Sequence, residues 1–263
     1  MPDRRAIAAL LAVSLAVPVT CAAAPPAQDP LLSLPVERVV PDQIRQMQQR
    51  LADWPQLQRY RSENAALPAA VAGQPRVVFF GDSITEGWGP TGSDTFFAGK
   101  GYVNRGISGQ TTAQMLVRFR QDVIALKPAV VVILAGTNDI AGNTGVATQG
   151  MIEDNLHSMV EVAKANGIAV VLASVLPVSA YPWRPGIAPA GKVRALNTAL
   201  RSYASEQHLV WLDYYSAMAN AQGGLDASLA TDGVHPTAAG YARMAPLAEA
   251  AIAQALAQHK DGT

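Results

Sequence analysis

Residues 77–87 read Val-Val-Phe-Phe-Gly-Asp-Ser-Ile-Thr-Glu-Gly, an apolar run followed by a short polar turn. The unbroken apolarity of residues 77–80 predicts a strand that is buried on both faces of a sheet. Gly81 permits a tight exit from that strand, so Ser83 stands at the start of the next segment, above the sheet edge. A serine at this place either caps a helix or acts as a nucleophile, and the stretch alone fits both interpretations. A phosphate-binding loop is disfavoured, because no Gly-Lys-Ser/Thr follows at the required spacing.

Outward from this stretch, β-branched runs alternate with helical patterns. Further strands are predicted at residues 102–104, 130–134, 169–175 and 209–212. Apolar residues three or four positions apart predict helices that include residues 115–123, 152–163, 193–203 and 239–257. The alternation calls for an α/β fold, a three-layer α/β/α sandwich around a parallel sheet with right-handed crossovers. Ligands of such sheets bind beyond the carboxyl ends of the strands, so the residues that follow each strand are the candidates for a site.

The main domain is expected at residues 76–258, with a helical arm ahead of it at residues 41–75. Apolar spacing in the arm predicts helical turns that are interrupted at Pro55, with Trp54 as a packing anchor. We interpret the arm as scaffold. Residues 25–40 are rich in proline and predict a linker, because proline supplies no helix or ladder donor.

Residues 1–24 have the pattern of a secretory signal peptide, with Arg4 and Arg5 ahead of an apolar run and small residues after it. The run is shorter than the roughly 20 residues that span a bilayer, so no stable membrane span is expected. The protein is therefore predicted to be exported, either periplasmic or secreted. Cys21 lies within this segment, and lipoprotein anchoring through it is the less favoured alternative, because residues 18–20 form a poor lipoprotein box.

The composition excludes several classes of site and partner. The 263 residues carry a formal net charge of +0, so no basic surface indicates nucleic acid or an anionic membrane, and a small or neutral ligand is expected. Cys21 is the single cysteine of the sequence, so the folded domain contains no disulfide framework, thiolate nucleophile or cysteine zinc site. Nothing in the sequence indicates the oligomeric state.

One of the four histidines has a sequence context that suits a general base. His235 lies in Thr-Asp-Gly-Val-His-Pro at residues 231–236, a polar turn just ahead of the last predicted helix. The ends of a four-residue turn lie within about 7 Å of each other, so the Asp232 carboxylate can reach the imidazole. Asp232 would then fix the tautomer and leave the other ring nitrogen free to take the proton of Ser83. An Asx turn before a helix is the alternative interpretation of the same residues.

Two later strand ends supply candidate donors for a developing oxyanion. Gly106 follows the second predicted strand, where glycine lets a backbone amide approach a substrate closely. Asn138, in Gly-Thr-Asn-Asp at residues 136–139, follows the third strand and can direct its side-chain amide to the same oxygen. Each segment alone is more often an ordinary loop, but all four candidate segments fall at the carboxyl edge of the expected sheet and each supplies a different role.

These ordered blocks resemble those of the SGNH or GDSL hydrolase family, from about Arg76 to the C-terminal helix. The resemblance implies a flavodoxin-like sheet of five parallel strands and no metal or organic cofactor. It makes Ser83 the nucleophile and completes a triad with Asp232 and His235. It also implies an oxyanion hole formed by the Ser83 amide, the Gly106 amide and the Asn138 side chain. The sequence at residues 81–85, 106–112 and 127–128 is similar to that of the platelet-activating-factor acetylhydrolase catalytic subunits, a branch of the family that favours short acyl groups.

The expected activity is hydrolysis of carboxylic esters through an acyl-serine intermediate, with short acyl groups such as acetyl esters of carbohydrate or lipid. An acyltransferase that uses the same serine, a lysophospholipase or thioesterase for longer chains, and a non-catalytic carbohydrate-binding module are the alternatives. Aromatic residues of two long loops either pack those loops or form a platform for a sugar ring or an acyl chain. They are Trp88, Phe96, Phe97, Tyr181 and Trp183.

Overall fold

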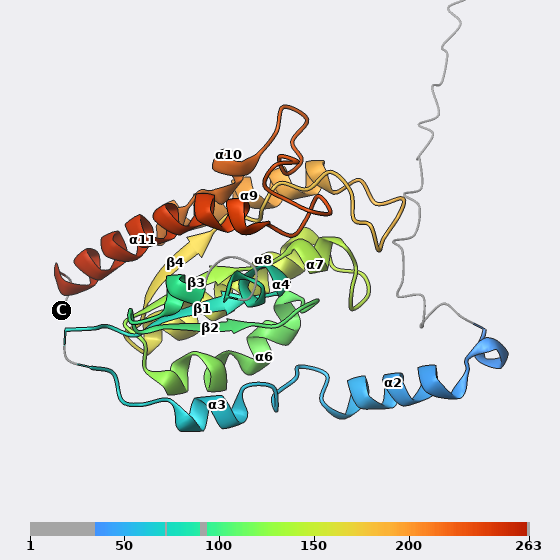
Figure 1. Ribbon diagram of the computed structural model, residues 1–263, viewed down its shortest axis with the longest axis horizontal. Coiled ribbons are helices and arrows are strands. Elements are labelled where there is room, and N and C mark those ends of the chain that lie inside the picture. Colours follow the sequence, from blue (N-terminus) through green and yellow to red (C-terminus); the bar gives the residue numbers. More distant parts are fainter. Residues whose placement is uncertain (1–34, 72, 90–93, 262–263) are drawn as a thin grey trace, which may run out of the picture.

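The computed structural model describes residues 35–71, 73–89 and 94–261, which fold around one parallel sheet (Figure 1). The five strands are β1 (Val77–Gly81), β2 (Tyr102–Gly106), β3 (Val130–Leu134), β4 (Ala169–Ala173) and β5 (Val210–Leu212). Their order across the sheet is β2-β1-β3-β4-β5, and every neighbouring pair is parallel. This is the predicted flavodoxin-like arrangement, and it is confirmed.

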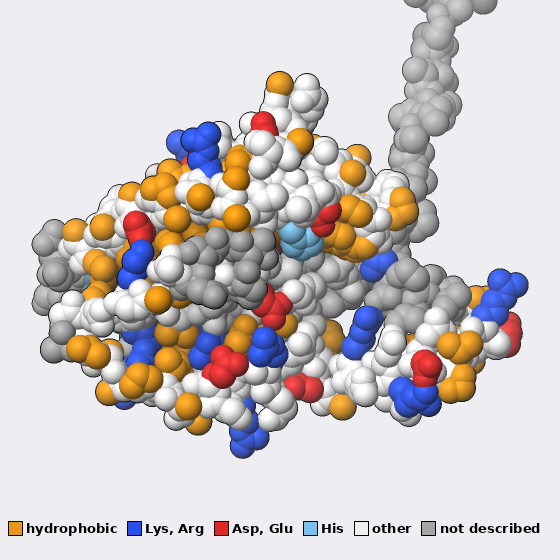
Figure 2. Space-filling model, viewed as in Figure 1, with side chains coloured by type: hydrophobic (Ala, Val, Ile, Leu, Met, Phe, Trp, Pro, Cys, Tyr) orange, Lys and Arg blue, Asp and Glu red, His pale blue; other side chains and the backbone are white. Residues whose placement is uncertain are grey.

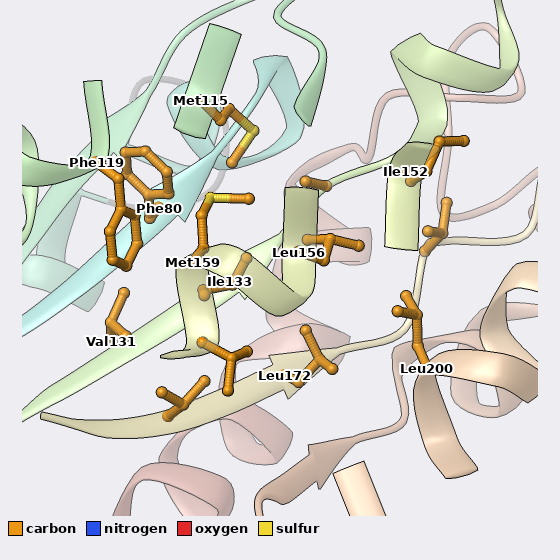
Figure 3. Packing of buried hydrophobic residues seen from close by; sticks show 14 of the residues in the cluster. Phe80, Met115, Phe119, Val131, Ile133, Ile152, Leu156, Met159, Leu172 and Leu200 are labelled. Atoms are coloured by element: carbon orange, nitrogen blue, oxygen red, sulfur yellow. The ribbon is translucent and has the colours of Figure 1, made fainter. Parts of the chain in front are cut away.

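Helices cover both faces of the sheet, so the predicted three-layer α/β/α sandwich is also confirmed. Alternate residues of β1 enter two separate cores: Val78 and Phe80 face one, and Val77 and Phe79 face the other. The first core is closed by α6 (Thr112–Asp122), α8 (Gln149–Ala165) and α9 (Pro189–Glu206) (Figure 3). The second core is closed by α10 (Tyr214–Met218) and α11 (Ala238–Asp261), together with Trp88 and Phe96.

Short elements complete the chain, and several of them sit where the strands end. They are the 3-10 helices η1 (Val36–Arg38) and η3 (Ile124–Leu126), and the helices α2 (Pro41–Ala52), α3 (Arg61–Ala66), α4 (Ser83–Glu86), α5 (Asp94–Phe97) and α7 (Thr137–Ile140). α4 and α7 directly follow β1 and β3, so both begin at the carboxyl edge of the sheet. In the part of the chain that the structure describes, every helix is too short or too polar to span a bilayer.

Strand ends differ slightly from the predicted ranges, for a local reason. β4 ends at Ala173, two residues before the predicted end at residue 175. The Asn197 side chain of α9 takes both backbone groups of Val175, accepting from its N–H at 2.8 Å and donating to its carbonyl at 2.9 Å. A side chain therefore replaces the ladder partner at this position, which a pattern of apolar residues does not reveal.

The arm at residues 41–75 is helical and broken near Pro55, as predicted, but its packing anchor is not Trp54. Trp54 is 40% exposed, so that prediction is wrong. Tyr60 is 5% exposed and is the buried aromatic residue of the arm. α2 carries no buried residue and projects from the body of the molecule (Figure 1). In the turn that follows α2, the Asp53 carboxylate accepts from the amides of Leu57 and Gln58 at 2.7 and 3.0 Å.

Two methionines of α8 allow a matched test of the first core. Met159 is fully buried, whereas Met151, on the same helix, is 51% exposed. Met159→Ala is expected to lower the free energy of unfolding by about 2–5 kcal/mol, because it leaves a cavity between α8 and the sheet. Met151→Ala should change it by less than about 0.5 kcal/mol. Urea unfolding followed by circular dichroism measures both; equal losses in the two variants would contradict the described packing.

Candidate active site

The turn between β1 and α4 presents Ser83 with its hydroxyl free of any capping role. Asp82 is the N-cap residue of α4, and its Oδ1 accepts from the Ile84 amide at 2.9 Å. Ser83 is the first residue of the helix. The alternative interpretation, in which Ser83 caps the helix, is therefore wrong. Gly81 is required ahead of this turn, since a Cβ there would lie 2.1 Å from Thr85 Oγ1.

Ser83, His235 and Asp232 form a continuous chain of hydrogen-bonding groups. Ser83 Oγ lies 2.9 Å from His235 Nε2, and His235 Nδ1 lies 2.7 Å from Asp232 Oδ2. The second contact fixes the tautomer: with its proton on Nδ1, the imidazole presents Nε2 to the serine as an acceptor. The three side chains thus have the geometry of an activated nucleophile, its base and the group that orients the base.

The Asp232 carboxylate is held in place and kept ionised by its own turn. Its Oδ1 accepts from the amides of His235 and Val234 at 2.8 and 2.9 Å, which leaves Oδ2 for the imidazole ring. Partial burial opposes ionisation, but the hydrogen bonds from His235 and Val234 outweigh it and hold the pKa of Asp232 below its usual value. Gly233 adopts φ of +79° in the middle of this turn, a conformation that favours glycine.

Two of the predicted oxyanion donors, the Asn138 side chain and the Gly106 amide, have different hydrogen-bond partners. The Asn138 side chain is buried beside Ser83, with Nδ2 donating to the Gln110 carbonyl at 3.0 Å and to Asp82 Oδ2 at 3.3 Å. The Gly106 amide donates to Asn104 Oδ1 at 2.9 Å. Because this N–H is already hydrogen-bonded, it is poorly placed to donate to an oxyanion. The oxyanion role of Gly106 stays a prediction, and the hydrogen bond to Asn104 argues against it.

Gly109, three residues further along the same loop, is a second candidate donor that the motif analysis missed. Its φ is +76°, and its carbonyl accepts from Asn143 Nδ2 at 3.1 Å. The same nitrogen of Asn143 donates to Asn138 Oδ1 at 2.8 Å, which ties Gly109 to the Asn138 side chain. Among the described residues, the Gly109 amide has no hydrogen-bond acceptor. The signal in the sequence was the glycine itself, in Ser-Gly-Gln after a strand end.

Asp82 is a buried carboxyl that sequence reasoning left without a role. It is 1% exposed, lies next to Ser83 and accepts from both Ile84 and Asn138. Burial raises the pKa of Asp82 from 3.8 to about 6; the Ile84 amide and the charge of His235 act in the opposite direction, while Asp139 adds to the rise. The sequence signal was the position of Asp82 immediately before Ser83. That position does not distinguish an aspartate that only caps a helix from one whose pKa is also raised.

Two of the other histidines, His157 and His208, occupy other parts of the fold. The His157 ring of α8 stacks on Tyr203 of α9, with centroids 3.7 Å apart. His208 has a φ of 56° in the turn ahead of β5, at the amino edge of the sheet and thus opposite to Ser83. His235 is therefore the histidine that the fold brings to the candidate nucleophile.

A cleft of about 310 Å³ opens beside the serine and histidine; several of its lining residues carry polar groups, but its exposed surface is more apolar than polar. The lining residues are Ser83, Glu86, Gly87, Ser108, Thr231, His235, Pro236 and Tyr241. Acidic and basic side chains are interspersed over the face shown in Figure 2, without a large patch of one sign. The volume enclosed by the described residues suits a small group.

Of the five loop aromatics, Trp183 lies next to His235 and is substantially exposed. Trp88, Phe96 and Tyr181 are buried, and Phe97 packs against the second core, so packing accounts for these four. Trp183 is 37% exposed, and its ring centroid lies 5.9 Å from that of His235. Its Nε1 donates to Asn143 Oδ1 at 3.2 Å, which anchors the indole beside Asn138.

Comparison with known proteins gives a family match and solved structures of the same fold. A model of the GDSL-like lipase/acylhydrolase family matches residues 79–243. A candidate acylhydrolase from Bacteroides fragilis is 48% identical, with a TM-score of 0.75 over 78% of this chain and 99% of its own. A Streptococcus pneumoniae structure named for platelet activating factor is 24% identical, with a TM-score of 0.67 over 81% of this chain and 99% of its own, which shows a shared fold.

Curated relatives cover shorter stretches. Esterase TesA of Pseudomonas aeruginosa is 31% identical over 143 residues, which are 54% of this chain and 64% of that protein. The acetylxylan esterase of Geobacillus stearothermophilus is 28% identical over 199 residues, which are 63% of this chain and 88% of that protein. The chain therefore spans less than two thirds of the Pseudomonas esterase.

The raised pKa of Asp82 predicts a pH-dependent stability. The unfolded carboxyl ionises near 3.8 and the folded one near 6, so the folded state loses stability as the pH rises through this window. The unfolding free energy of the wild type, minus that of Asp82→Asn, should fall by about 2 kcal/mol between pH 4 and pH 7. Urea unfolding at both pH values measures it. Parallel pH profiles for the two proteins would contradict a raised pKa at this carboxyl.

Proposed function

Since the chain belongs to the GDSL-like lipase/acylhydrolase family, we propose that it hydrolyses carboxylic esters through an acyl-serine intermediate on Ser83. The observation that carries the proposal is the chain of contacts from Ser83 Oγ to His235 Nε2 at 2.9 Å and from His235 Nδ1 to Asp232 Oδ2 at 2.7 Å. A serine hydroxyl needs such a base to become a useful nucleophile.

In the first half-reaction, Ser83 Oγ forms a bond to the ester carbonyl carbon while His235 Nε2 takes the hydroxyl proton. The tetrahedral intermediate then collapses, the bond from carbon to the alcohol oxygen breaks, and the imidazolium returns its proton to the leaving alcohol. Asp232 stabilises the imidazolium through Nδ1–H. The lowered pKa of Asp232 suits this role, because the carboxylate stays ionised while the ring is charged.

The negative charge on the carbonyl oxygen requires preorganised donors. We assign this role to the amide of Ser83, at the start of α4, and to the Asn138 side chain, which would exchange its 3.3 Å contact with Asp82 for the substrate oxygen. For the third donor the family resemblance names Gly106. The engaged amide of Gly106 and the unengaged amide of Gly109 favour Gly109 instead.

In the second half-reaction a water molecule replaces the alcohol. His235 takes its proton, the hydroxide attacks the acyl carbon, and the intermediate releases the acid while the proton returns to Ser83 Oγ. The site is therefore restored without any net change in the protein. An acyltransferase would follow the same path with a sugar hydroxyl in place of water.

The substrate that we propose is a short acyl ester on a carbohydrate. The cleft that the described residues form beside Ser83 has a volume of about 310 Å³, and this small size disfavours a lysophospholipase or a long-chain thioesterase. The exposed indole of Trp183 beside His235 suits stacking against a sugar ring. The similarity to an acetylxylan esterase supports the same substrate class.

We further propose that the protein acts outside the cytoplasm, in the periplasm or as a secreted enzyme. The basis is the signal-peptide pattern at residues 1–24, which lies outside the described residues.

The proposed chemistry predicts the behaviour of two serines that line the same cleft. Ser83→Ala is expected to lower kcat for p-nitrophenyl acetate about 10⁴-fold or more, because the variant has no nucleophile. Ser108→Ala should stay within about tenfold of wild type, since its hydroxyl donates to Glu86 and not to His235. Circular dichroism checks that both variants are folded. Comparable turnover by wild type and Ser83→Ala would contradict the nucleophile assignment.

The same assay measures the size of the acyl site. With acetate, butyrate and octanoate esters, kcat/KM is expected to fall as the chain lengthens, because the cleft has a volume of about 310 Å³, which suits a small group. A preference for octanoate would instead favour the lysophospholipase or thioesterase alternative.

A further inference from the structure

The arm ahead of the family-matched region contacts the catalytic edge of the sheet through specific hydrogen bonds. Residues 53–66, here called the arm segment, precede residue 79, where the family match begins. Three glutamine side chains donate to its backbone carbonyls: Gln110 to Pro55 at 2.8 Å, Gln114 to Trp54 at 2.7 Å and Gln121 to Leu57 at 2.7 Å. Gln110 belongs to the loop that follows β2, so the arm segment reaches the candidate oxyanion loop itself.

Tyr60 makes the most direct of these contacts. Its side chain is buried, and its hydroxyl donates to the carbonyl of Gly106. The guanidinium groups of Arg59 and Arg105 lie 4.7 and 4.6 Å from the centroid of its ring. Tyr60 is thus held in one orientation by the two cations while its hydroxyl engages the last residue of β2.

The Gly106–Ile107 peptide is therefore held at both of its polar atoms. Its carbonyl accepts from Tyr60, and its N–H, on Ile107, donates to the Gly81 carbonyl at 3.1 Å. Gly81 lies two residues before Ser83. Because a peptide unit is planar, two such bonds leave the unit little freedom to rotate. The orientation of this one peptide links the strand that presents Ser83 to the loop that carries Gly109.

Buried Arg118 holds the same loop from α6. Its guanidinium donates to Gln110 Oε1 at 2.5 Å, to the Arg105 carbonyl at 2.9 Å and to the Gly81 carbonyl at 2.9 Å. The loop thus has a support within the main domain and another from the arm segment. The arm segment adds what Arg118 does not supply, a donor to the Gly106 carbonyl.

We propose that Tyr60 is a positioning residue of the active site, which sets the loop that carries the Gly109 amide relative to Ser83 by holding the Gly106 carbonyl. The proposal rests on the proposed acyl-serine function. The arm segment then contributes to the geometry of the active site and is not only scaffold. The part of the chain needed for catalysis therefore begins well before residue 79, where the family match starts.

Tyr60→Phe tests the proposal in the full chain, since it removes one hydroxyl and keeps the ring that Arg59 and Arg105 contact. With p-nitrophenyl acetate, kcat is expected to fall about tenfold while KM stays within about twofold, because small displacements of catalytic donors mainly affect the transition state. Gln121→Leu is the matched control. It removes another bond to the arm segment, at the far end of α6, and should leave kcat within about twofold.

A thermal melt of the same samples separates positioning from stability, because a purely structural role lowers the melting temperature without lowering kcat at 25 °C. Loss of kcat in Tyr60→Phe but not in Gln121→Leu supports the proposal. An unchanged kcat in Tyr60→Phe, or an equal loss in both variants, overturns it while wild-type turnover leaves the esterase function intact. Absence of turnover by folded wild type overturns both.

Discussion

The parallel register of β1 with its two neighbours is the constraint on which the active site depends. Gly81 pairs with Gly106 on one side and with Leu134 on the other, so three strands end level with one another. The segments that follow them carry Ser83, the Gly106–Gly109 loop and Asn138 to one edge. A register shift of one residue would turn each strand's side chains to the opposite core and displace these groups together.

His235, the proposed base, reaches this edge from the far end of the chain. His235 is separated from Ser83 by 152 residues, and the intervening fold must place it within hydrogen-bonding distance. α11, which begins just after His235, packs on the sheet and also bonds directly to the serine turn, since Tyr241 Oη donates to the Ile84 carbonyl at 2.8 Å. The helix that follows His235 therefore also holds the turn that presents Ser83.

Much of this could be predicted from the sequence, because strand order and loop position follow from the alternation of apolar runs and from motif residues next to strand ends. The contact between Ser83 and His235 was anticipated in this way. Patterns could not separate Trp54 from Tyr60 as the buried residue of the arm, since that depends on which carbonyls the side chains of α6 capture. Nor could spacing reveal that Asn104 engages the Gly106 amide, or that Asp82 is buried beside the nucleophile.

Activation of Ser83 as a nucleophile by His235 can be measured by incubating the protein with a fluorophosphonate probe and locating the adduct by peptide mass spectrometry, for wild type and His235→Ala. We expect one adduct per chain, on the peptide that contains Ser83, and a labelling rate that is nearly lost in His235→Ala. An adduct on another serine, or no adduct on well-folded wild type, would contradict this activation.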